Sequence, residues 1–205
     1  MYKINIYKIL MTHFVVLIIV PKYIYIKGLE NVTLYINDTL YRYDENLPVE
    51  PYIVIPKIKL EKKYRKYMMN NNDNKYNTIE KYTKGYKGYD LDENGNAIST
   101  YNKDTLYDWF EIGGRWDGLF TDNKYENDLL KNNSISVEEL IKGFRDTGRT
   151  YSILIDPNKN IYKDRNMYWF GLYTKNKTEE EWKKEYLDVL SKNKDHYVVN
   201  LDCHI

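Results

Sequence analysis

The sequence contains few of the residues that would assign it to a specialised class of protein. Cys203 is the single cysteine among 205 residues, so the chain cannot form an intramolecular disulfide, and we expect a reducing, cytoplasmic compartment. Neither sign of charge dominates, because 31 Lys and Arg stand against 30 Asp and Glu, which gives a net charge of +1. This balance of charge does not indicate nucleic-acid binding, although a local basic patch would not be visible in the net charge of the chain.

The sequence also lacks an apolar run long enough to span a membrane. The longest run, ILMTHFVVLIIV, covers only residues 9–20, whereas a spanning helix needs about 20 apolar residues. No small-residue cleavage site follows it, so it does not match a secretory signal. Its β-branched part, His13 to Val20, is ended by Pro21 and predicts a buried strand. We therefore expect no membrane partner.

Common catalytic and ligand-binding motifs are missing as well. The chain has no P-loop, GxGxxG, HExxH, GxSxG or CxxC motif, so the sequence indicates no particular cofactor. Residues 90–101, DLDENGNAISTY, match the first half of an EF-hand loop, but the twelfth position is Tyr101 where calcium requires a bidentate Glu. Asn94-Gly95 predicts instead the tight turn of a β-hairpin.

The rest of the chain alternates between helical and strand patterns. Helices are predicted over Ile58–Met69 and after the N-cap residues Ser136 and Thr178, because apolar residues recur there at helical spacing. Short β-branched and aromatic runs predict further strands at Tyr23–Ile26, Val32–Ile36, Tyr151–Ile155, Tyr168–Leu172 and His196–Leu201.

This order of elements predicts an α+β fold, with a mainly antiparallel sheet and helices on one face. The expected core is a ferredoxin-like βαββαβ arrangement with insertions. Met11 is a second possible start of the chain, so residues 1–10 are interpreted as an N-terminal extension. Residues 11–205 are then expected to form a single α+β domain, with room for one elaborated insertion.

Two of the three histidines stand at the ends of the first and last predicted strands. If those strands run antiparallel side by side, His13 and His204 meet at one end of the sheet, and Asp202 shares a face with His204. Two imidazoles and a carboxylate are suited to an acid–base pair or a metal site. The alternative is a pair of edge histidines that form only structural hydrogen bonds. Cys203 is not expected to act as a nucleophile with His204, because neighbours on a strand point to opposite faces.

The stretch DWFEIGGRWDG, residues 108–118, combines aromatic, glycine and charged residues most densely. Its two adjacent glycines permit positive φ and close approach of a partner, and its arginine supplies a planar fork for a carboxylate or phosphate. Its two tryptophans offer stacking surfaces for an anionic, nucleotide-like ligand. The candidate binding residues are Trp109, Gly113, Gly114, Arg115 and Trp116.

A structural alternative applies to the same stretch. Aromatic residues at such spacing usually fill a core, so Trp109 and Trp116 can simply join elements of the fold. In that case Arg115 is expected to form an ion pair with Glu111 or Asp117.

Several segments, in order along the chain, resemble the pattern of a family of phage and bacterial proteins found in Firmicutes and actinobacteria. They are MTHF from Met11, YDEN from Tyr43, DWFEIGGRW and the terminal DCHI. Members of that family begin near MTHF and carry WDWYxIGGRW, for which this chain has Tyr107-Asp108-Trp109-Phe110 in the first four positions. The resemblance covers residues 11–205 and implies a cytoplasmic protein of phages, prophages or mobile elements. It implies no activity and no cofactor.

Two functions from different classes are therefore expected as alternatives. The first is a phage or mobile-element protein that binds an anionic small ligand or a host protein, with counter-defence as the role that its context implies. The second is a small hydrolase acting on a phosphorylated or nucleic-acid substrate, with His13 and His204 as acid–base groups or metal ligands. Asp202 would orient or ligate, and Arg115 would stabilise developing charge. The sequence leaves open whether the protein is an enzyme.

Overall fold

The computed structural model describes residues 7–8, 13–71, 74–121, 125, 127–168, 172–175 and 177–205. The chain divides into two compact units: unit 1 comprises Met1–Glu45 and Asp104–Ile205, and unit 2 comprises Asn46–Lys103. The insertion for which the sequence left room is thus unit 2. The expected N-terminal extension, residues 1–10, lies outside the described residues except for Tyr7–Lys8.

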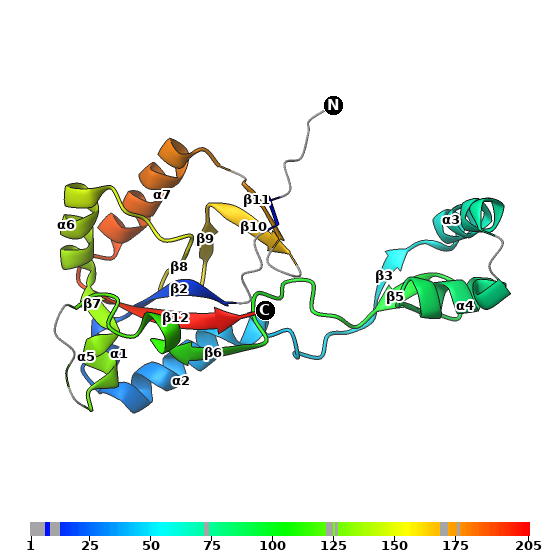
Figure 1. Cartoon of the computed structure of the whole chain (residues 1–205). Helices are drawn as coiled ribbons and strands as arrows, with labels where there is room; N and C mark the ends of the chain where they lie inside the picture. The colour runs from blue at the N-terminus through cyan, green and yellow to red at the C-terminus, as the bar shows by residue number, and fades with distance from the viewer. Residues whose placement is uncertain are drawn as a thin grey trace. The chain divides into compact units, whose positions relative to one another are not determined.

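Unit 1 is built on a six-stranded mixed sheet (Figure 1). Its main path runs β6-β12-β2-β8-β9, and β7 pairs with β12 beside this path. All neighbouring pairs are antiparallel except β2 and β8, which are parallel. The strands are β2 (His13–Val20), β6 (Trp109–Ile112), β7 (Ser134–Ser136), β8 (Ile153–Ile155), β9 (Ile161–Lys163) and β12 (Tyr197–His204).

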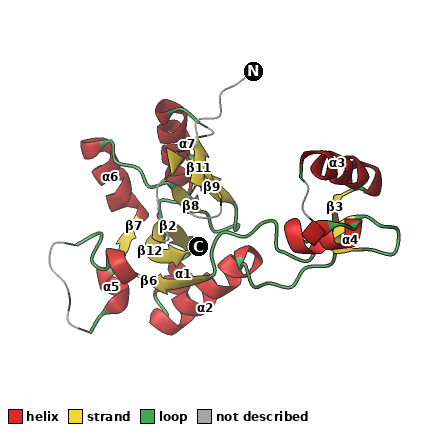
Figure 2. Cartoon of the chain, turned by 45° about the vertical axis from the view of Figure 1, so that its right-hand side comes forward, coloured by secondary structure: helices red, strands yellow, loops and turns green. Residues whose placement is uncertain are grey.

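Helices cover both faces of this sheet, not the single face that the sequence predicted (Figures 1 and 2). Alternate residues of β2 enter two separate apolar clusters: Val16 and Ile18 pack with α2, whereas Leu17 packs with α6 and α7. Because β2 is central and apolar at every position from Val16 to Val20, both of its faces require a cover. The helices concerned are α1 (Lys22–Tyr25), α2 (Leu29–Leu40), α6 (Val137–Thr147) and α7 (Glu179–Lys192).

The α+β class and the mainly antiparallel pairing are confirmed, whereas the strand order differs from a ferredoxin-like core. In a βαββαβ core, the strand that follows the first helix lies at the edge next to the third strand. Here that place beside β8 is taken by β9, which follows β8 directly through a turn. The strand that follows α2 and unit 2 is β6, and it pairs with β12 at the opposite edge.

The segment after Pro21 was expected to form two strands and instead forms α1 and α2. Val32, Ile36 and Leu40 are fully buried and are separated by four residues each, which is the spacing of one helix face. The β-branched side chains by themselves favour a strand. The helix forms because it places these three apolar residues together against the sheet. Gly28 precedes α2 with φ of 89°, a backbone conformation that requires glycine.

The two helices on the other face begin where the sequence predicted. Ser136 and Glu139 form a capping box at the start of α6, and Gly148 ends that helix in the left-handed conformation. Thr178 and Glu181 form the corresponding capping box of α7. The buried residues of both helices, among them Trp182 and Tyr186, face the central sheet.

A second, three-stranded sheet of unit 1 has the order β1-β11-β10. Its strands are β1 (Tyr7–Lys8), β10 (Arg165–Tyr168) and β11 (Leu172–Lys175). The single strand expected over Tyr168–Leu172 is therefore replaced by the end of β10 and the start of β11, and residues 169–171 lie outside the described residues. In the described part of the chain, no helix is long and apolar enough to cross a membrane.

Unit 2 combines a small antiparallel sheet, in the order β3-β5-β4, with helices α3 and α4. The predicted helix and hairpin are both present, and Gly95 in the hairpin turn has φ of 78°. A tyrosine-rich cluster around the fully buried Leu60 forms the core of this unit. The elements are β3 (Tyr52–Ile55), α3 (Lys57–Asn70), α4 (Ile79–Lys81), β4 (Asp90–Leu91) and β5 (Ala97–Ser99).

Candidate active site

The pairing of β2 with β12 brings the two predicted histidines together. His13 lies directly opposite His204 in the register of these antiparallel strands. Their ring centroids are 4.9 Å apart, and the rings are inclined by 75°. The expectation that the ends of the first and last long strands meet at one end of the sheet is met by this geometry.

Each of the two imidazoles contacts its own carboxylate. Nδ1 of His13 lies 2.9 Å from Oδ1 of Asp202, and Nδ1 of His204 lies 2.8 Å from Oδ1 of Asp108. A carboxylate only accepts hydrogen bonds, so Nδ1 carries the proton in both rings, and Nε2 has the lone pair when the ring is neutral. Within the described residues, neither Nε2 has a hydrogen-bond partner.

The carboxylate of Asp202 is buried, with 2% of its side chain exposed, and is held from two sides. Its Oδ1 contacts His13, and its Oδ2 accepts a hydrogen bond of 3.0 Å from the backbone N–H of Arg115. A buried carboxylate requires hydrogen-bond partners for its oxygens, and these two contacts provide them. Asp202 thus fixes both the tautomer and the orientation of the His13 ring.

Gly114 is what allows the backbone to approach this carboxylate. A Cβ built at Gly114 would lie 2.5 Å from Cβ and 2.6 Å from Oδ2 of Asp202, which is closer than real contacts permit. The φ of Gly114 is +52°, a region that L-residues rarely adopt. The stretch that was predicted to bind a ligand therefore serves first to position Asp202, and the two candidate sites form one site.

The neighbouring Gly113 lies equally close to a buried amide. Its hypothetical Cβ would be 2.5 Å from both Nδ2 and Oδ1 of Asn133. The Asn133 amide accepts a hydrogen bond from the N–H of Gly118 and donates to Oδ1 of Asp117 and to the carbonyl of Leu129. Asn133 thus links the glycine-rich turn to the helix that follows it, α5 (Leu129–Asn132).

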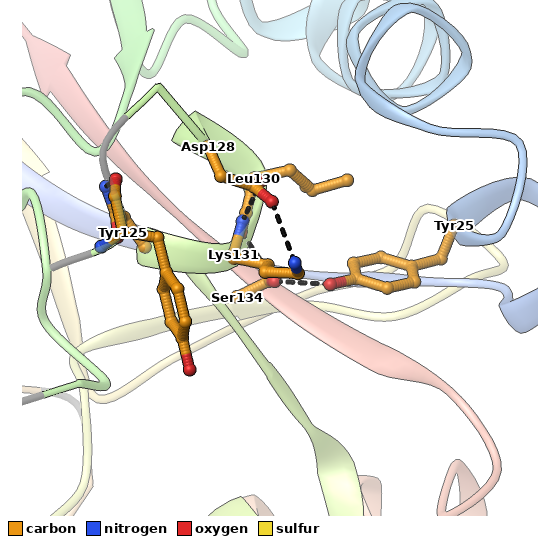
Figure 3. A network of polar contacts seen from close by, with 7 residues as sticks. Tyr25, Tyr125, Asp128, Leu130, Lys131 and Ser134 are labelled. Carbon is orange, nitrogen blue, oxygen red and sulfur yellow. Dashed lines mark hydrogen bonds and ion pairs between the residues drawn. The ribbon is translucent and has the colours of Figure 1, made fainter. Parts of the chain in front are cut away.

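Helix α5 is itself anchored by a network of polar contacts, which Figure 3 shows. Asp128 caps the helix by accepting from the N–H of Lys131 and forms an ion pair with that lysine at 3.1 Å. The hydroxyl groups of Tyr25 and Ser134 lie 2.7 Å apart, and Ser134 donates to the carbonyl of Leu130. Through Asn133, the turn that holds Asp202 is therefore linked to a helix with polar anchors of its own.

Trp109 joins the histidines, whereas Trp116 does not. The Trp109 ring stacks on His204 at 5.4 Å with 12° between the planes and meets His13 edge-on at 5.3 Å. Trp109 is nevertheless 43% exposed and also lines a groove of about 560 Å³ between β6 and α2. In the described part of the chain, the Trp116 ring makes no contact with another aromatic ring, so it does not pack with Trp109 and the histidines.

Arg115 is exposed, and its guanidinium forms no ion pair with any described residue. The structural alternative, in which Arg115 pairs with Glu111 or Asp117, is therefore not observed. The backbone of Arg115 is fixed at Asp202, so the guanidinium is tethered within one side-chain length of the His13–Asp202 pair.

Cys203, which lies between Asp202 and His204 in the sequence, is fully buried. Burial, together with the adjacent Asp202 carboxylate, raises the pKa of its thiol far above the ordinary value. The thiol is therefore kept neutral and unreactive, which agrees with the expectation that it is not a nucleophile.

In the parts of the chain that the structure describes, no group of three or more His, Cys, Asp or Glu could hold a metal ion. The metal-ligand interpretation of His13, Asp202 and His204 accordingly gains no support from their arrangement, in which each Asp faces a single ring nitrogen.

Sequence reasoning missed Asp108 and Asn133. Asp108 stands in the conspicuous stretch, but its pairing with His204 depends on β6 lying next to β12, which no local pattern indicates. Asn133 lies in a polar segment without a motif, and only its burial in the fold distinguishes it from neighbouring asparagines.

Comparisons of this chain with models of protein families, with curated proteins and with solved structures gave no match. The resemblance to the phage and bacterial family stays a prediction, and the function has to be argued from the residues of the site.

Proposed function

We propose that this protein is a histidine-dependent hydrolase acting on a phosphorylated or nucleic-acid substrate. One observation carries the proposal: His13 and His204 lie side by side, and each Nδ1 contacts a carboxylate while each Nε2 has no described partner. Two adjacent imidazoles with a fixed tautomer form a general base and a general acid, provided that one is neutral and the other protonated.

The reaction that suits this pair is the cleavage of a phosphoester bond. Nε2 of the neutral imidazole removes a proton from a water molecule or a neighbouring hydroxyl as its oxygen attacks phosphorus. The bond from phosphorus to the leaving oxygen breaks, and Nε2 of the imidazolium donates its proton to that oxygen. The carboxylates of Asp202 and Asp108 stabilise the protonated rings, and exchange with solvent restores the initial protonation states.

Arg115 is the group that would hold the substrate anion. Its guanidinium is not engaged by a described acidic residue, although the carboxylates of Asp202 and Asp108 lie at the histidine pair. A planar guanidinium can donate two parallel hydrogen bonds to two oxygens of a phosphate group. Its positive charge also stabilises the negative charge that develops on those oxygens. The exposed Trp109 offers a surface for a base or another planar part of the substrate.

The test is a hydrolysis assay with bis(p-nitrophenyl) phosphate, cyclic nucleotides and single-stranded RNA as probes. We expect turnover by the native chain with a bell-shaped pH dependence of kcat/KM, because one base and one acid are required. His13→Gln and His204→Gln should each lower kcat by roughly 10²- to 10⁴-fold.

His196→Gln is the matched control, because His196 precedes β12 and contacts neither pair. This variant should retain the activity of the native chain. Absence of hydrolysis with all three probes, or full activity in His13→Gln and His204→Gln, would overturn the proposal.

A non-catalytic binding protein is the second candidate, favoured by the exposed Trp109 and by the Arg115 guanidinium, which forms no ion pair with a described residue. In that case the chain binds an anionic nucleotide-like ligand without converting it. Binding of a nucleotide that is lost in Arg115→Ala, with no hydrolysis by the native chain, would support this candidate over the hydrolase.

A further inference from the structure

The charge of the chain is unevenly distributed between its two units. Residues 46–103 contain eleven Lys and Arg and seven Asp and Glu, a net charge of +4. The remaining residues contain twenty Lys and Arg and twenty-three Asp and Glu, a net charge of −3. The overall value of +1 therefore hides a basic unit 2, which the sequence left open as a possibility.

Helix α3 concentrates this positive charge. Its fourteen residues include a single acidic residue, Glu61, which forms a long ion pair of 3.9 Å with Arg65. No described residue forms an ion pair with the other five basic side chains. The six basic residues of α3 are all exposed: Lys57, Lys59, Lys62, Lys63, Arg65 and Lys66.

The basic residues of α3 occupy positions that lower the stability of the helix. Lys57 and Lys59 occupy its first turn, where the helix dipole disfavours cations, and its last turn has no basic residue. Helices α6 and α7 of the same chain have the favourable arrangement, with acidic first turns and a basic residue in the last turn. A departure from a local stability rule points to selection for function.

One face of α3 carries the charge, and the opposite face belongs to the core of unit 2. Lys59, Lys62 and Lys66 follow one another at the spacing of a helix stripe. Leu60 and Tyr64 lie on the other side and pack into the tyrosine-rich core cluster. Among the described residues of unit 2, the basic stripe therefore has no acidic partner apart from the Glu61–Arg65 pair beside it.

A lysine outside α3, Lys87, lies over two tyrosines that pack next to this helix. The ammonium group of Lys87 lies 4.9 Å from the ring centre of Tyr86 and 5.7 Å from that of Tyr82. Tyr82 and Tyr86 stack on each other at 5.3 Å, and Tyr86 remains 52% exposed. Tyr82 itself is buried, so Tyr86 is the ring that is open to a base, and a basic side chain beside an exposed aromatic ring is typical of surfaces that bind a phosphate backbone and stack against bases.

We infer that unit 2 binds the phosphate backbone of a nucleic acid through the basic stripe of α3 and the neighbouring lysine–tyrosine cluster. An anionic membrane is the less suitable occupant, because an interfacial helix needs a broad apolar face. The apolar face of α3 is used by its own core, and the exposed apolar residues of the helix, Ile58, Met68 and Met69, lie at its two ends.

This inference does not rest on the proposed hydrolysis, and its test avoids turnover. The full-length His13→Gln chain is titrated against a labelled single-stranded RNA, a single-stranded DNA and a duplex of about two dozen nucleotides, with fluorescence anisotropy as the readout. We expect binding at low salt, with log K falling linearly with log of the salt concentration, because bound lysines release counterions.

The decisive variant is Lys59→Gln/Lys62→Gln/Lys66→Gln. Gln has nearly the helix propensity of Lys, so α3 should be retained, which circular dichroism checks. We expect the affinity to fall by at least about tenfold. The slope of log K against log salt concentration should become shallower by about 2, because each lost phosphate contact contributes about 0.7 to 0.9 to that slope. The matched control is Lys142→Gln/Lys184→Gln/Lys194→Gln, which removes the same charge from exposed positions of unit 1 and should bind like the parent.

Three results would overturn the inference. The first is no binding to any of the nucleic acids at low salt. The second is an equal loss of affinity in the unit 1 control, which would indicate a general charge effect. The third is binding to vesicles that contain phosphatidylserine but not to nucleic acid, which would assign the basic stripe to a membrane surface. Hydrolysis without nucleic-acid binding would overturn this inference and leave the proposed function intact. Nucleic-acid binding without hydrolysis would do the reverse.

Discussion

Gly114 leaves no room for a side chain next to Asp202, and this contact joins the glycine-rich turn to the histidine pair. The backbone N–H of Arg115 reaches Oδ2 of Asp202 because a Cβ at Gly114, which would lie 2.6 Å from that oxygen, is missing. Asp202 in turn holds Nδ1 of His13. These four residues thus connect the features that looked like separate sites in the sequence.

Gly114→Ala should therefore be costly for stability and for the site. The left-handed backbone alone costs an L-residue about 1 to 2 kcal/mol, and the clash with Asp202 should add about 1 to 3 kcal/mol. We expect urea-induced unfolding to show the combined loss, and the His13 ring signals in NMR spectra to shift as the carboxylate moves.

Gly148→Ala is the control for this prediction. Gly148 has φ of +66°, but its nearest neighbour is the flexible end of Lys183 at 4.0 Å. It should therefore show only the backbone cost and no change at His13. Equal losses in the two variants would show that the contact between Gly114 and Asp202 does not restrict the site.

Stability should decrease in alkaline solution because of buried tyrosines. Burial raises the pKa of Tyr35 from 10.0 to about 12, and its hydroxyl donates toward the carbonyls of Ile19 and Pro157. A group whose pKa is higher in the folded than in the unfolded state stabilises the fold while it is protonated. This contribution is complete at pH values below the pKa of the unfolded state and is lost as the pH rises through the pKa of the folded state. We expect the free energy of unfolding to fall between about pH 10 and pH 12.

Tyr35→Phe should flatten this decrease, because it removes the ionising hydroxyl while keeping the ring. Tyr41→Phe, at a position that is 63% exposed, should leave the pH dependence as it is in the native chain. Chemical unfolding at a series of pH values measures both. An unchanged alkaline slope in Tyr35→Phe would assign the effect to other groups.

Local patterns predicted the parts of the fold that depend on neighbouring residues. The central strand His13–Val20, the capping boxes at Ser136 and Thr178, and the hairpin at Asn94-Gly95 are all present. Each of them is decided by side chains within a few residues, through burial, a backbone hydrogen bond or a positive φ.

What the sequence could not predict depends on contacts between distant strands. The β-branched residues of α2 favour a strand by themselves, and only the sheet surface below them selects the helix. The pairing of Asp108 with His204 requires β6 at the edge next to β12, although 96 residues separate the two side chains. The meeting of His13 and His204 was predictable because it needs a single assumption, that the first and last strands pair.

The two compact units should unfold independently, because each has a core of its own. Leu17 is fully buried in the central sheet of unit 1, and Leu60 is fully buried in the tyrosine-rich cluster of unit 2. Leu→Ala at either position removes buried apolar contacts and should cost about 2 to 5 kcal/mol in its own unit. In Leu60→Ala, hydrogen exchange should accelerate over residues 46–103 while amides of β2 and β12 keep their protection. Leu17→Ala should give the reverse pattern. Parallel loss of protection in both units by either variant would show instead that they unfold as one cooperative body.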